Sequence, residues 1–442
     1  MRTSQLRIAT LSLHSSPLAE LGGEIAGGMN VFVREVSREL GRFGHRLDIF
    51  TRRDNPDQPP VIEIDEGVRL IHLSAGPAAS RSRHQISQHI PQLQEALKKW
   101  PAEAYDLVHA HYWISGAAGR RWAAEKGIPF VQMFHTMERT KRRVLGNGHA
   151  EDPQRSSEEE TLGQSADALT VGSLQDRDSL TADYGIAPEK IHVVPGGVNP
   201  SVFPHQPQEV ARRRTGLPPG RVALFVGRIE PVKGLETLIR ALVLLRREGG
   251  DNCSWRLVVI GGDADPHFLE NNGRNASNHS GKRYLDEVRK LAHDLGMADR
   301  VTFLGSKPQK YLADYYAAAD CCVFPSIYET FGLAVIEALA CGGVVVASEI
   351  GGYPHRLAQE KAGLLVPPGN AGAFAEALDR VCTDAVLRED LRRRAPEVAR
   401  QFTWNNTARQ LLEIYRTLLE KNQGRGESHQ AADAKEGIAI CG

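Results

Sequence analysis

Residues 321–343 read CCVFPSIYETFGLAVIEALACGG, and this stretch decides how the half of the chain around it is interpreted. The run CCVFPS is typical of a short buried strand. The segment from Thr330 onward predicts a helix that is apolar on nearly every side, which is the pattern of a buried helix. Glu337 lies inside that helix, and a buried carboxylate needs a hydrogen-bonding partner because an unpaired charge is very costly there. Ribose hydroxyls would satisfy it, and a neighbouring Lys or Arg is the alternative.

The same alternation of short apolar strands and helices continues in both directions. The second half contains RVALFVGR, RLVVIGG, RVTFLG and VVVAS, and the first half contains RIATLSL, RLDIFT, DLVHAHY, PFVQMFH and ALTVGS. Strands that alternate with helices indicate a parallel sheet with helices on both faces. The turn-rich stretch VVPGGVNPSVF near residue 195 separates the two series. We therefore predict an α/β protein with two doubly wound domains.

The chain length of 442 residues is consistent with this division. We expect an N-terminal domain over residues 1–200 and a C-terminal domain over 201–401, followed by an amphipathic helix over 402–422. The polar tail over 423–442 is expected to be disordered. The segment 263–282, which is rich in Asn, Gly and Ser, is expected to be a mobile surface loop.

Composition excludes several function classes. Lys plus Arg equals Asp plus Glu, 54 against 54, so no overall field favours nucleic acid or an anionic membrane. The N-terminal residues contain no apolar stretch long enough for a signal peptide or a spanning helix, so we expect no stable membrane insertion. The 6 cysteines include no CxxC pair and are expected to be free thiols in a reducing compartment. These features predict a cytoplasmic protein.

Two further motifs lie where predicted strands end. The sequence GGMN at residues 27–30 precedes the expected helix VFVREVSREL, and glycines let a phosphate approach the positive end of a helix. In VGRIEPVKG, Arg228 and Lys233 follow a strand at the edge where ligands bind in open α/β sheets, and together they could neutralise a diphosphate. The alternatives are a tight turn at the glycines and ordinary solvated cations.

Taken together, these motifs resemble the retaining glycosyltransferases of family 4. The resemblance rests on Glu329 and Glu337 with FGL between them, on VGRIEPVKG, on GGMNVFV preceded by HSSP, and on HAHYW and FHT. It extends to about residue 420 and implies the GT-B fold, in which two Rossmann-like domains face each other across a cleft. In that fold the final helix crosses back to the first domain, as the segment 402–422 could do.

The resemblance also implies roles for individual residues. Glu329 would hold hydroxyls of the donor sugar, Glu337 the ribose, and the two cations of VGRIEPVKG the diphosphate. His135 in FHT would stabilise the transition state, although the same residue could be a buried core histidine. The implied donor site comprises Gly28, Arg228, Lys233, Glu329, Phe331, Gly332, Leu333 and Glu337. The implied catalytic residues are His135, Glu329, Arg228 and Lys233.

The resemblance implies neither a cofactor nor a metal. The triplet at residues 263–265 resembles a metal-binding motif of a different glycosyltransferase fold, and His109 and His111 could form a metal pair, but no third ligand stands out. The implied reaction is a front-side attack in which the departing phosphate takes the acceptor proton. Catalysis would then rest on positioning and on stabilisation of the leaving group.

Two branches of the family fit the sequence. One resembles sucrose-phosphate synthase, and the main expectation is therefore transfer of glucose from UDP-glucose to fructose 6-phosphate, which gives sucrose 6-phosphate. The other is the inositol-phosphate transferase of mycothiol biosynthesis, which uses UDP-N-acetylglucosamine. Both acceptors carry a phosphate, and the resemblance implies an acceptor site of Arg83, Tyr112, Thr136, Arg142 and Arg155. The sequence leaves open the donor base and sugar, the acceptor and the oligomeric state.

Two other classes of protein share the expected fold. A GT-B epimerase would not need the motif that contains Glu329. A non-catalytic protein that binds nucleotide sugars would keep Glu337 but could lose Glu329 and His135. All three residues are present, which favours an enzyme.

Overall fold

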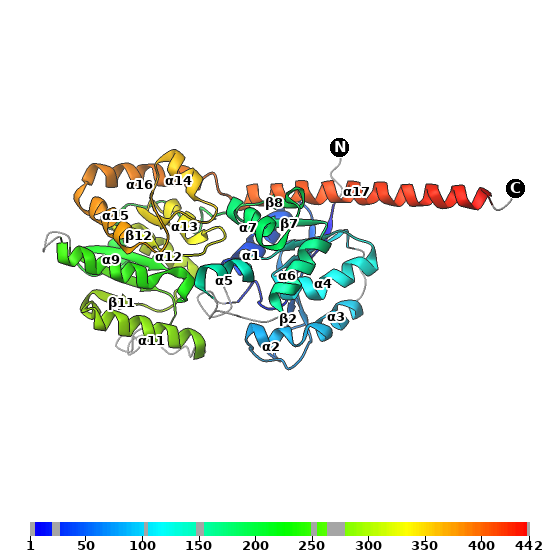
Figure 1. The fold of residues 1–442 in the computed structure, drawn as a ribbon, viewed down its shortest axis with the longest axis horizontal. Coiled ribbons are helices and arrows are strands. Elements are labelled where there is room, and N and C mark those ends of the chain that lie inside the picture. The colour runs from blue at the N-terminus through cyan, green and yellow to red at the C-terminus, as the bar shows by residue number, and fades with distance from the viewer. Residues whose placement is uncertain are drawn as a thin grey trace.

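The computed structural model describes residues 5–19, 27–100, 105–146, 154–248, 254–262 and 279–439. Figure 1 shows two α/β domains beside each other, with one long helix that runs along the first domain and extends beyond it. Each domain is built around a single sheet, and the two sheets share no strand. The predicted α/β class with two doubly wound units is therefore confirmed.

The sheet of the first domain has eight strands in the order β3-β4-β2-β1-β5-β6-β7-β8. Neighbouring strands are parallel, except that β3 and β4 are antiparallel. The order reverses at β1, and the loops that follow β1 and β5 diverge at such a point and leave a crevice. The strands are β1 (Arg7–Leu11), β2 (Arg46–Arg52), β3 (Val61–Asp65), β4 (Val68–Leu73), β5 (Leu107–His111), β6 (Phe130–Met133), β7 (Ala168–Val171) and β8 (Ile191–Val193).

The sheet of the second domain has six strands in the order β11-β10-β9-β12-β13-β14, all of them parallel. Here the order reverses at β9, which lies between β10 and β12. The strands are β9 (Arg221–Val226), β10 (Trp255–Ile260), β11 (Val301–Phe303), β12 (Cys321–Phe324), β13 (Val345–Ser348) and β14 (Leu364–Val366).

Helices connect the strands and cover the sheets. Those of the first domain are α1 (Gly28–Arg42), α2 (Arg83–Ser87), α3 (Ile90–Lys99), α4 (Trp113–Lys126), α5 (Glu138–Leu145), α6 (Arg155–Ser165) and α7 (Leu174–Tyr184). Those that follow are α8 (Gln208–Thr215), α9 (Leu235–Glu248), α11 (His279–Asp294), α12 (Gln309–Ala318), α13 (Leu333–Ala340), α14 (Pro354–Glu360), α15 (Ala371–Thr383), α16 (Ala385–Ala399) and α17 (Trp404–Ala439).

The strands read as apolar runs because both of their faces are buried. Every residue of β5 and of β12 is buried. Along β9, Val222 and Leu224 belong to one core cluster, whereas Ala223 and Phe225 belong to another. Successive side chains of a strand point to opposite faces of the sheet, so these two clusters lie on opposite faces. The apolar runs of the sequence therefore correspond to strands covered on both sides.

Helix α17 leaves the second domain and packs on the first. Its residues Leu411 and Tyr415 are fully buried in one core cluster with Ile8 of β1 and Val33 of α1. The hydroxyl of Tyr415 also lies 2.6 Å from Nδ1 of His109 on β5. The last helix of the chain thus completes the core of the first domain.

The end of the chain differs from the expectation of a disordered tail over residues 423–442. The backbone is helical as far as Ala439, and residues 440–442 lie outside the described residues. The segment contains several Ala, Glu, Gln, Lys and Arg residues, which have high helix propensity. Extending a helix that is already nucleated costs far less than starting one, so the docked part of α17 can continue into this segment.

The cysteines only partly match the prediction from the sequence. Cys321, Cys322 and Cys341 are buried free thiols, but Cys382 is disulfide-bonded, contrary to the expectation of free thiols. Cysteine spacing does not reveal which thiols folding brings within bonding distance, so the sequence could not show this.

Most of the expected loop 263–282, including the acidic triplet, lies outside the described residues, and helix α11 already begins at residue 279.

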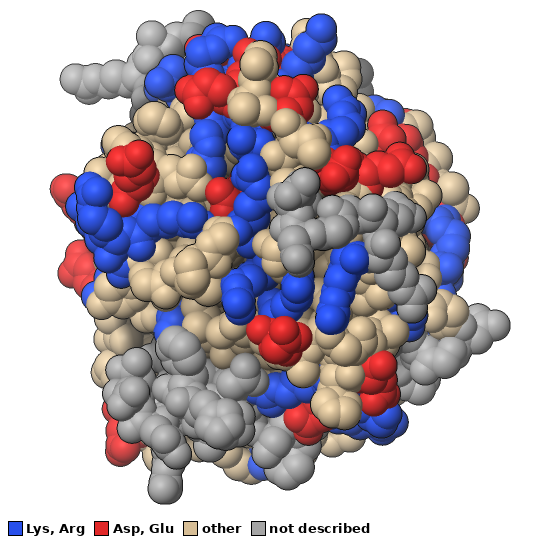
Figure 2. All heavy atoms as spheres, turned by 90° about the vertical axis from the view of Figure 1, so that its left-hand side faces the viewer, with Lys and Arg blue, Asp and Glu red and all other residues tan. Residues whose placement is uncertain are grey.

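The outer surface carries charge of both signs. Figure 2 views the molecule from the second-domain end and shows basic and acidic side chains interspersed over that face. Within the part of the chain that the structure describes, no helix combines the length and apolar character needed to cross a membrane.

The docking of α17 can be tested by truncation of Leu411 to Ala. Leu411 is fully buried, and loss of a buried leucine side chain typically costs about 2–5 kcal/mol of unfolding free energy. Urea denaturation followed by tryptophan fluorescence should show this loss. Glu413→Ala on the exposed face of the same helix is the control and should change stability by less than about 0.5 kcal/mol. Equal effects of the two changes would contradict the packing described here.

Candidate active site between the two domains

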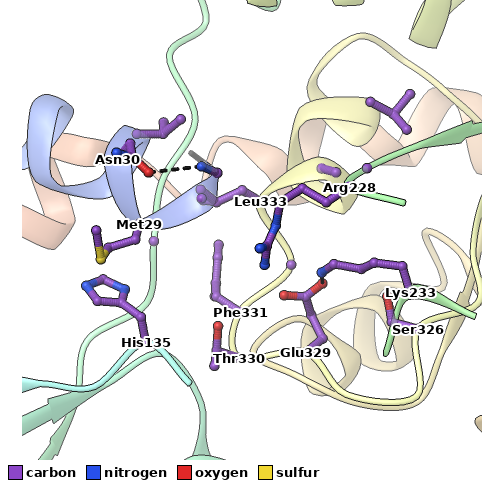
Figure 3. Close-up of a pocket in the computed structure, with 18 of the residues that line it drawn as sticks. Met29, Asn30, His135, Arg228, Lys233, Ser326, Glu329, Thr330, Phe331 and Leu333 are labelled. Atoms are coloured by element: carbon purple, nitrogen blue, oxygen red, sulfur yellow. Dashed lines mark hydrogen bonds and ion pairs between the residues drawn. The ribbon is translucent and has the colours of Figure 1, made fainter. Parts of the chain in front are cut away.

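A cavity of about 290 Å³ lies between the two domains. Its walls include residues of the loops that follow strands of both sheets. Tyr112 follows β5 directly, and Arg228 and Glu329 lie within a few residues of the ends of β9 and β12. The carboxyl ends of both sheets therefore face one space. Figure 3 shows Arg228, Lys233 and Glu329 converging in the cavity, with His135 and Met29 on its other side.

The cavity brings together most of the residues predicted from the sequence. Its lining includes Gly28, Arg83, Tyr112, His135, Thr136, Arg228, Lys233, Glu329, Phe331, Gly332, Leu333 and Glu337. Arg142 and Arg155 are not among the lining residues. Residues that the sequence did not single out also line the cavity: Asn30, Lys141, Glu230, Lys307, Gln309 and Tyr328.

The turn before α1 is held open by a buried asparagine. The side-chain oxygen of Asn30 accepts a hydrogen bond from the backbone N–H of Gly27 at 2.9 Å, and its amide group donates to Oγ of Ser15 at 2.6 Å. Asn30 is fully buried, so these bonds fix the turn. A Cβ atom at Gly27 would lie 3.3 Å from Nε of Arg228, which is a tight contact. Glycine therefore lets the N-terminus of α1 approach the second domain closely.

Both predicted clamp cations are paired with carboxylates. Nζ of Lys233 lies 2.6 Å from Oε2 of Glu329, and a guanidinium nitrogen of Arg228 lies 2.8 Å from Oε1 of Glu230. All four side chains are about one-fifth to one-quarter exposed, so they are reachable from the cavity. The pairs hold the cations in place beside the N-terminus of α1.

Helix α13 begins later than the sequence suggests. The sequence favoured Thr330 as its start, but Gly332 is the N-cap and the first helical residue is Leu333. Gly332 has a φ of 94°, and a Cβ atom there would lie 2.4 Å from the ring of Tyr353. Only glycine satisfies both constraints, so the helix begins after this point. The N-terminus of α13, with its free backbone N–H groups, consequently points into the cavity.

Glu337 is buried and has polar partners rather than cationic ones. Oε1 accepts from Nε2 of Gln309 at 3.0 Å, and Oε2 accepts from the hydroxyl of Tyr316 at 3.0 Å. Gln309 in turn accepts from Arg34 of the first domain at 3.1 Å. Burial raises the pKa of Glu337 to about 7, although both hydrogen bonds act to lower it. The predicted alternative of a direct Lys or Arg partner is not what the structure shows.

His135 is half-buried and contacts a pair of fully buried histidines, His111 and His109. Its Nε2 lies 2.9 Å from Nδ1 of His111, whose ring lies 4.3 Å from that of His109. Burial lowers the pKa of His135 to about 3 and that of His111 well below its ordinary value, with further lowering from His109. The rings are therefore neutral at pH 7. His135 also has a φ of 60°, a conformation that few residues other than glycine adopt.

Two of the residues predicted to bind the acceptor, Arg142 and Arg155, do not line the cavity. Arg142 is part-exposed and pairs with Glu138 at 3.3 Å. Arg155 is fully buried: its Nε donates to Glu159 at 2.7 Å and a second nitrogen donates to the backbone oxygen of Thr136 at 2.7 Å. A buried guanidinium needs such partners, so Arg155 lies behind the cavity wall and supports it.

Lys141 takes a place that the sequence analysis did not assign. It is 7% exposed and lines the cavity together with Arg83. Its segment reads ERTKRRV, and the run of basic residues gives no indication of which one faces inward. Helical geometry decides this, because neighbours along a helix point about 100° apart. Its closeness to the FHT motif is the one feature of the sequence that points to Lys141.

Comparison with known proteins agrees with this geometry. The family described as Glycosyltransferase Family 4 matches residues 26–202, and the family described as Glycosyl transferases group 1 matches residues 207–398. The D-inositol 3-phosphate glycosyltransferase of Jonesia denitrificans is 38% identical over 421 residues, which cover 92% of this chain and 95% of that protein. A protein of the same activity from Catenulispora acidiphila is 36% identical over 428 residues, with 95% and 97% covered.

Among solved structures, the sucrose-phosphate synthase of Thermosynechococcus elongatus has a TM-score of 0.83 at 33% identity, with 94% of this chain and 100% of that chain covered. Two α/β domains with a cavity between the carboxyl ends of their sheets, together with this similarity, define the GT-B fold. The full-length similarity makes the assignment more specific. The chain belongs to glycosyltransferase family 4.

Replacement of Glu337 by Gln tests the pKa of this residue. The folded protein holds the Glu337 proton more tightly than the unfolded chain does between about pH 4.5 and 7, so the stability of the wild type falls as pH rises through this window. Glu337→Gln has no carboxyl to titrate and should therefore gain stability over the wild type above pH 7, by up to about 3 kcal/mol. Urea denaturation at pH 5 and pH 8 measures this difference. A gain of equal size at both pH values would contradict the raised pKa.

Proposed function

We propose that this glycosyltransferase moves a sugar from a UDP-sugar, with retention, onto inositol 3-phosphate. The observation that carries the acceptor is the 38% identity to a D-inositol 3-phosphate glycosyltransferase over 92% of this chain. The sucrose-phosphate synthase structure is 33% identical. Inositol 3-phosphate with UDP-N-acetylglucosamine therefore replaces the sequence-based expectation of fructose 6-phosphate with UDP-glucose, which becomes the second candidate.

The acceptor phosphate is assigned to the first-domain side of the cavity. Arg83 and Lys141 both line this side, and each can form charge-assisted hydrogen bonds to phosphate oxygens. The guanidinium of Arg83 lies 5.9 Å from the ring centroid of Tyr112 and that of Arg155 lies 4.9 Å from it, but only Arg83 lines the cavity. Arg155 then acts as a positioning residue for Tyr112 and Thr136 rather than as a phosphate ligand.

The donor is assigned to the second domain. Arg228 and Lys233 would hold the diphosphate together with the N-terminal N–H groups of α1, since a helix N-terminus favours a phosphate group. Glu329 would accept hydrogen bonds from the sugar, and Glu337 would accept them from the ribose. In the proposed reaction the leaving diphosphate takes the acceptor proton, so these cations stabilise the charge that develops there.

His135 would contribute as a neutral ring beside the reacting sugar, because its pKa lies near 3. A neutral imidazole has one donor nitrogen and one acceptor nitrogen. The contact with His111 uses Nε2, so the proposed interaction with the sugar falls to the remaining ring atoms and the backbone of the strained turn.

The acceptor assignment is tested by a panel of substrates. Wild-type protein should release UDP from UDP-N-acetylglucosamine with inositol 3-phosphate far faster than with inositol or fructose 6-phosphate. Arg83→Ala should raise the KM for the acceptor by about tenfold or more while the KM for the donor stays unchanged, because one charge-assisted hydrogen bond is lost. Arg83→Lys should restore part of the loss. Coupled detection of UDP and mass spectrometry of the product provide the measurements.

Arg142→Ala is the matched control for this panel. The substitution removes the same charge from a nearby residue that does not line the cavity. It should leave both KM values within about twofold of the wild type. Equal use of inositol and inositol 3-phosphate by the wild type would refute the phosphate-bearing acceptor. Faster turnover with fructose 6-phosphate and UDP-glucose would establish the second candidate instead.

A further inference from the structure

The cavity contains one carboxylate to which the proposed reaction assigns no role. Glu329 and Glu230 each pair with one cation of the diphosphate clamp, Lys233 and Arg228 respectively. Glu329 has the donor sugar as its proposed ligand. Glu230 lines the cavity beside Arg228, one of the two cations proposed to bind the diphosphate, and a negative charge there opposes the binding of another one.

The backbone fixes Glu230 in this place. It follows β9 in the segment VGRIEPVKG, between the two clamp cations. Its N–H donates to the backbone oxygen of Arg228 at 3.1 Å, and its own backbone oxygen accepts from the N–H of Lys233 at 3.0 Å. These bonds form a tight turn, and the side chain, 21% exposed, lines the cavity. The turn fixes the backbone of Glu230 between the two cations, and the ion pair with Arg228 at 2.8 Å holds its carboxylate at the cavity.

Cations of both domains act on Glu230. Burial pushes its pKa upward, but Arg228, Lys233, Lys141 and Arg83 together outweigh burial and hold the pKa below its ordinary value. Glu230 is therefore ionised at neutral pH. Arg228 and Lys233 belong to the donor side, whereas the other two cations line the acceptor side. The charge of this one residue consequently reduces the positive potential on both sides of the cleft.

We propose that Glu230 weakens the binding of the nucleoside diphosphate product more than that of the donor, and so speeds product release. This inference rests on the proposed function as a nucleotide-sugar-dependent transferase. In the donor both phosphates are esterified, whereas the product has a terminal phosphate whose second ionisation lies near pH 6. The product thus carries about one more negative charge than the donor at neutral pH. Repulsion by the nearby Glu230 carboxylate therefore acts more strongly on the product.

A purely structural role makes the opposite prediction. If Glu230 served only to hold Arg228 in position, its replacement would loosen the clamp and weaken the binding of every diphosphate. Repulsion instead predicts tighter binding after the charge is removed. Glu230→Gln distinguishes these roles because the amide keeps the size of the side chain and an oxygen that can accept from Arg228.

The experiment is isothermal titration of wild type and Glu230→Gln with UDP, uridine and UDP-N-acetylglucosamine at pH 8. UDP should bind the variant about tenfold more tightly, the UDP-sugar by a smaller factor, and uridine with unchanged affinity. The gain for UDP should shrink as salt rises, because screening weakens charge repulsion. Glu376→Gln, the same change at an exposed position on α15, should leave all three affinities unchanged.

Kinetics supply a second measurement. Slower release of UDP should lower kcat in Glu230→Gln and produce a burst of product in the first turnover, with inhibition by UDP increased about tenfold. Unchanged or weaker UDP binding by the variant would overturn the proposal, as would an equal gain for uridine. Because UDP binding needs no acceptor, tighter binding in a protein that does not use inositol 3-phosphate would uphold this inference while the proposed acceptor fails. Absence of UDP binding by the wild type would overturn both.

Discussion

The site depends on one constraint of parallel sheets: all strands of such a sheet end at the same edge. Tyr112 follows β5 and Arg228 follows β9, so residues far apart in the chain meet wherever two such edges face each other. Neither sheet could form the cavity alone, because Arg228 and Lys233 follow a strand of one sheet and His135 follows a strand of the other. The apposition of the two edges brings these side chains together.

Close packing explains the glycines at the cavity, between the two domains at Gly27 and within the second domain at Gly332. At Gly27 and Gly332 a side chain would crowd Arg228 and Tyr353 respectively, and both glycines open onto helix N-termini that point inward. His135 has a positive φ at the same cavity. Backbone strain of this kind persists only where the surroundings hold it. His135 contacts the buried His111, which packs on His109, and His109 contacts the hydroxyl of Tyr415 on α17. The last helix is thus linked to this turn through two buried histidines.

Charge in this protein is a local property. The chain has equal numbers of acidic and basic residues, and the face seen in Figure 2 mixes both signs. In the cavity, by contrast, Arg228 pairs with Glu230 and Lys233 with Glu329, and all four side chains are about one-fifth to one-quarter exposed. Electrostatic interactions between such groups are stronger than on the surface because little water separates them. Small changes of charge at this point therefore alter ligand binding far more than similar changes elsewhere.

The sequence by itself determined the α/β class, the two domains and the position of the local motifs, because hydrophobic periodicity and glycine turns act over a few residues. It placed Arg228, Lys233 and Glu329 correctly on the loops that follow strands. Only the tertiary structure decided that Lys141 faces the cavity, that Arg155 lies behind it, and that Gln309 and Tyr316 are the partners of Glu337. These facts depend on contacts between segments distant in sequence, and on which side of a helix each residue lies after packing. Local pattern carries no information on either point, since one basic run can present any of its members to the core.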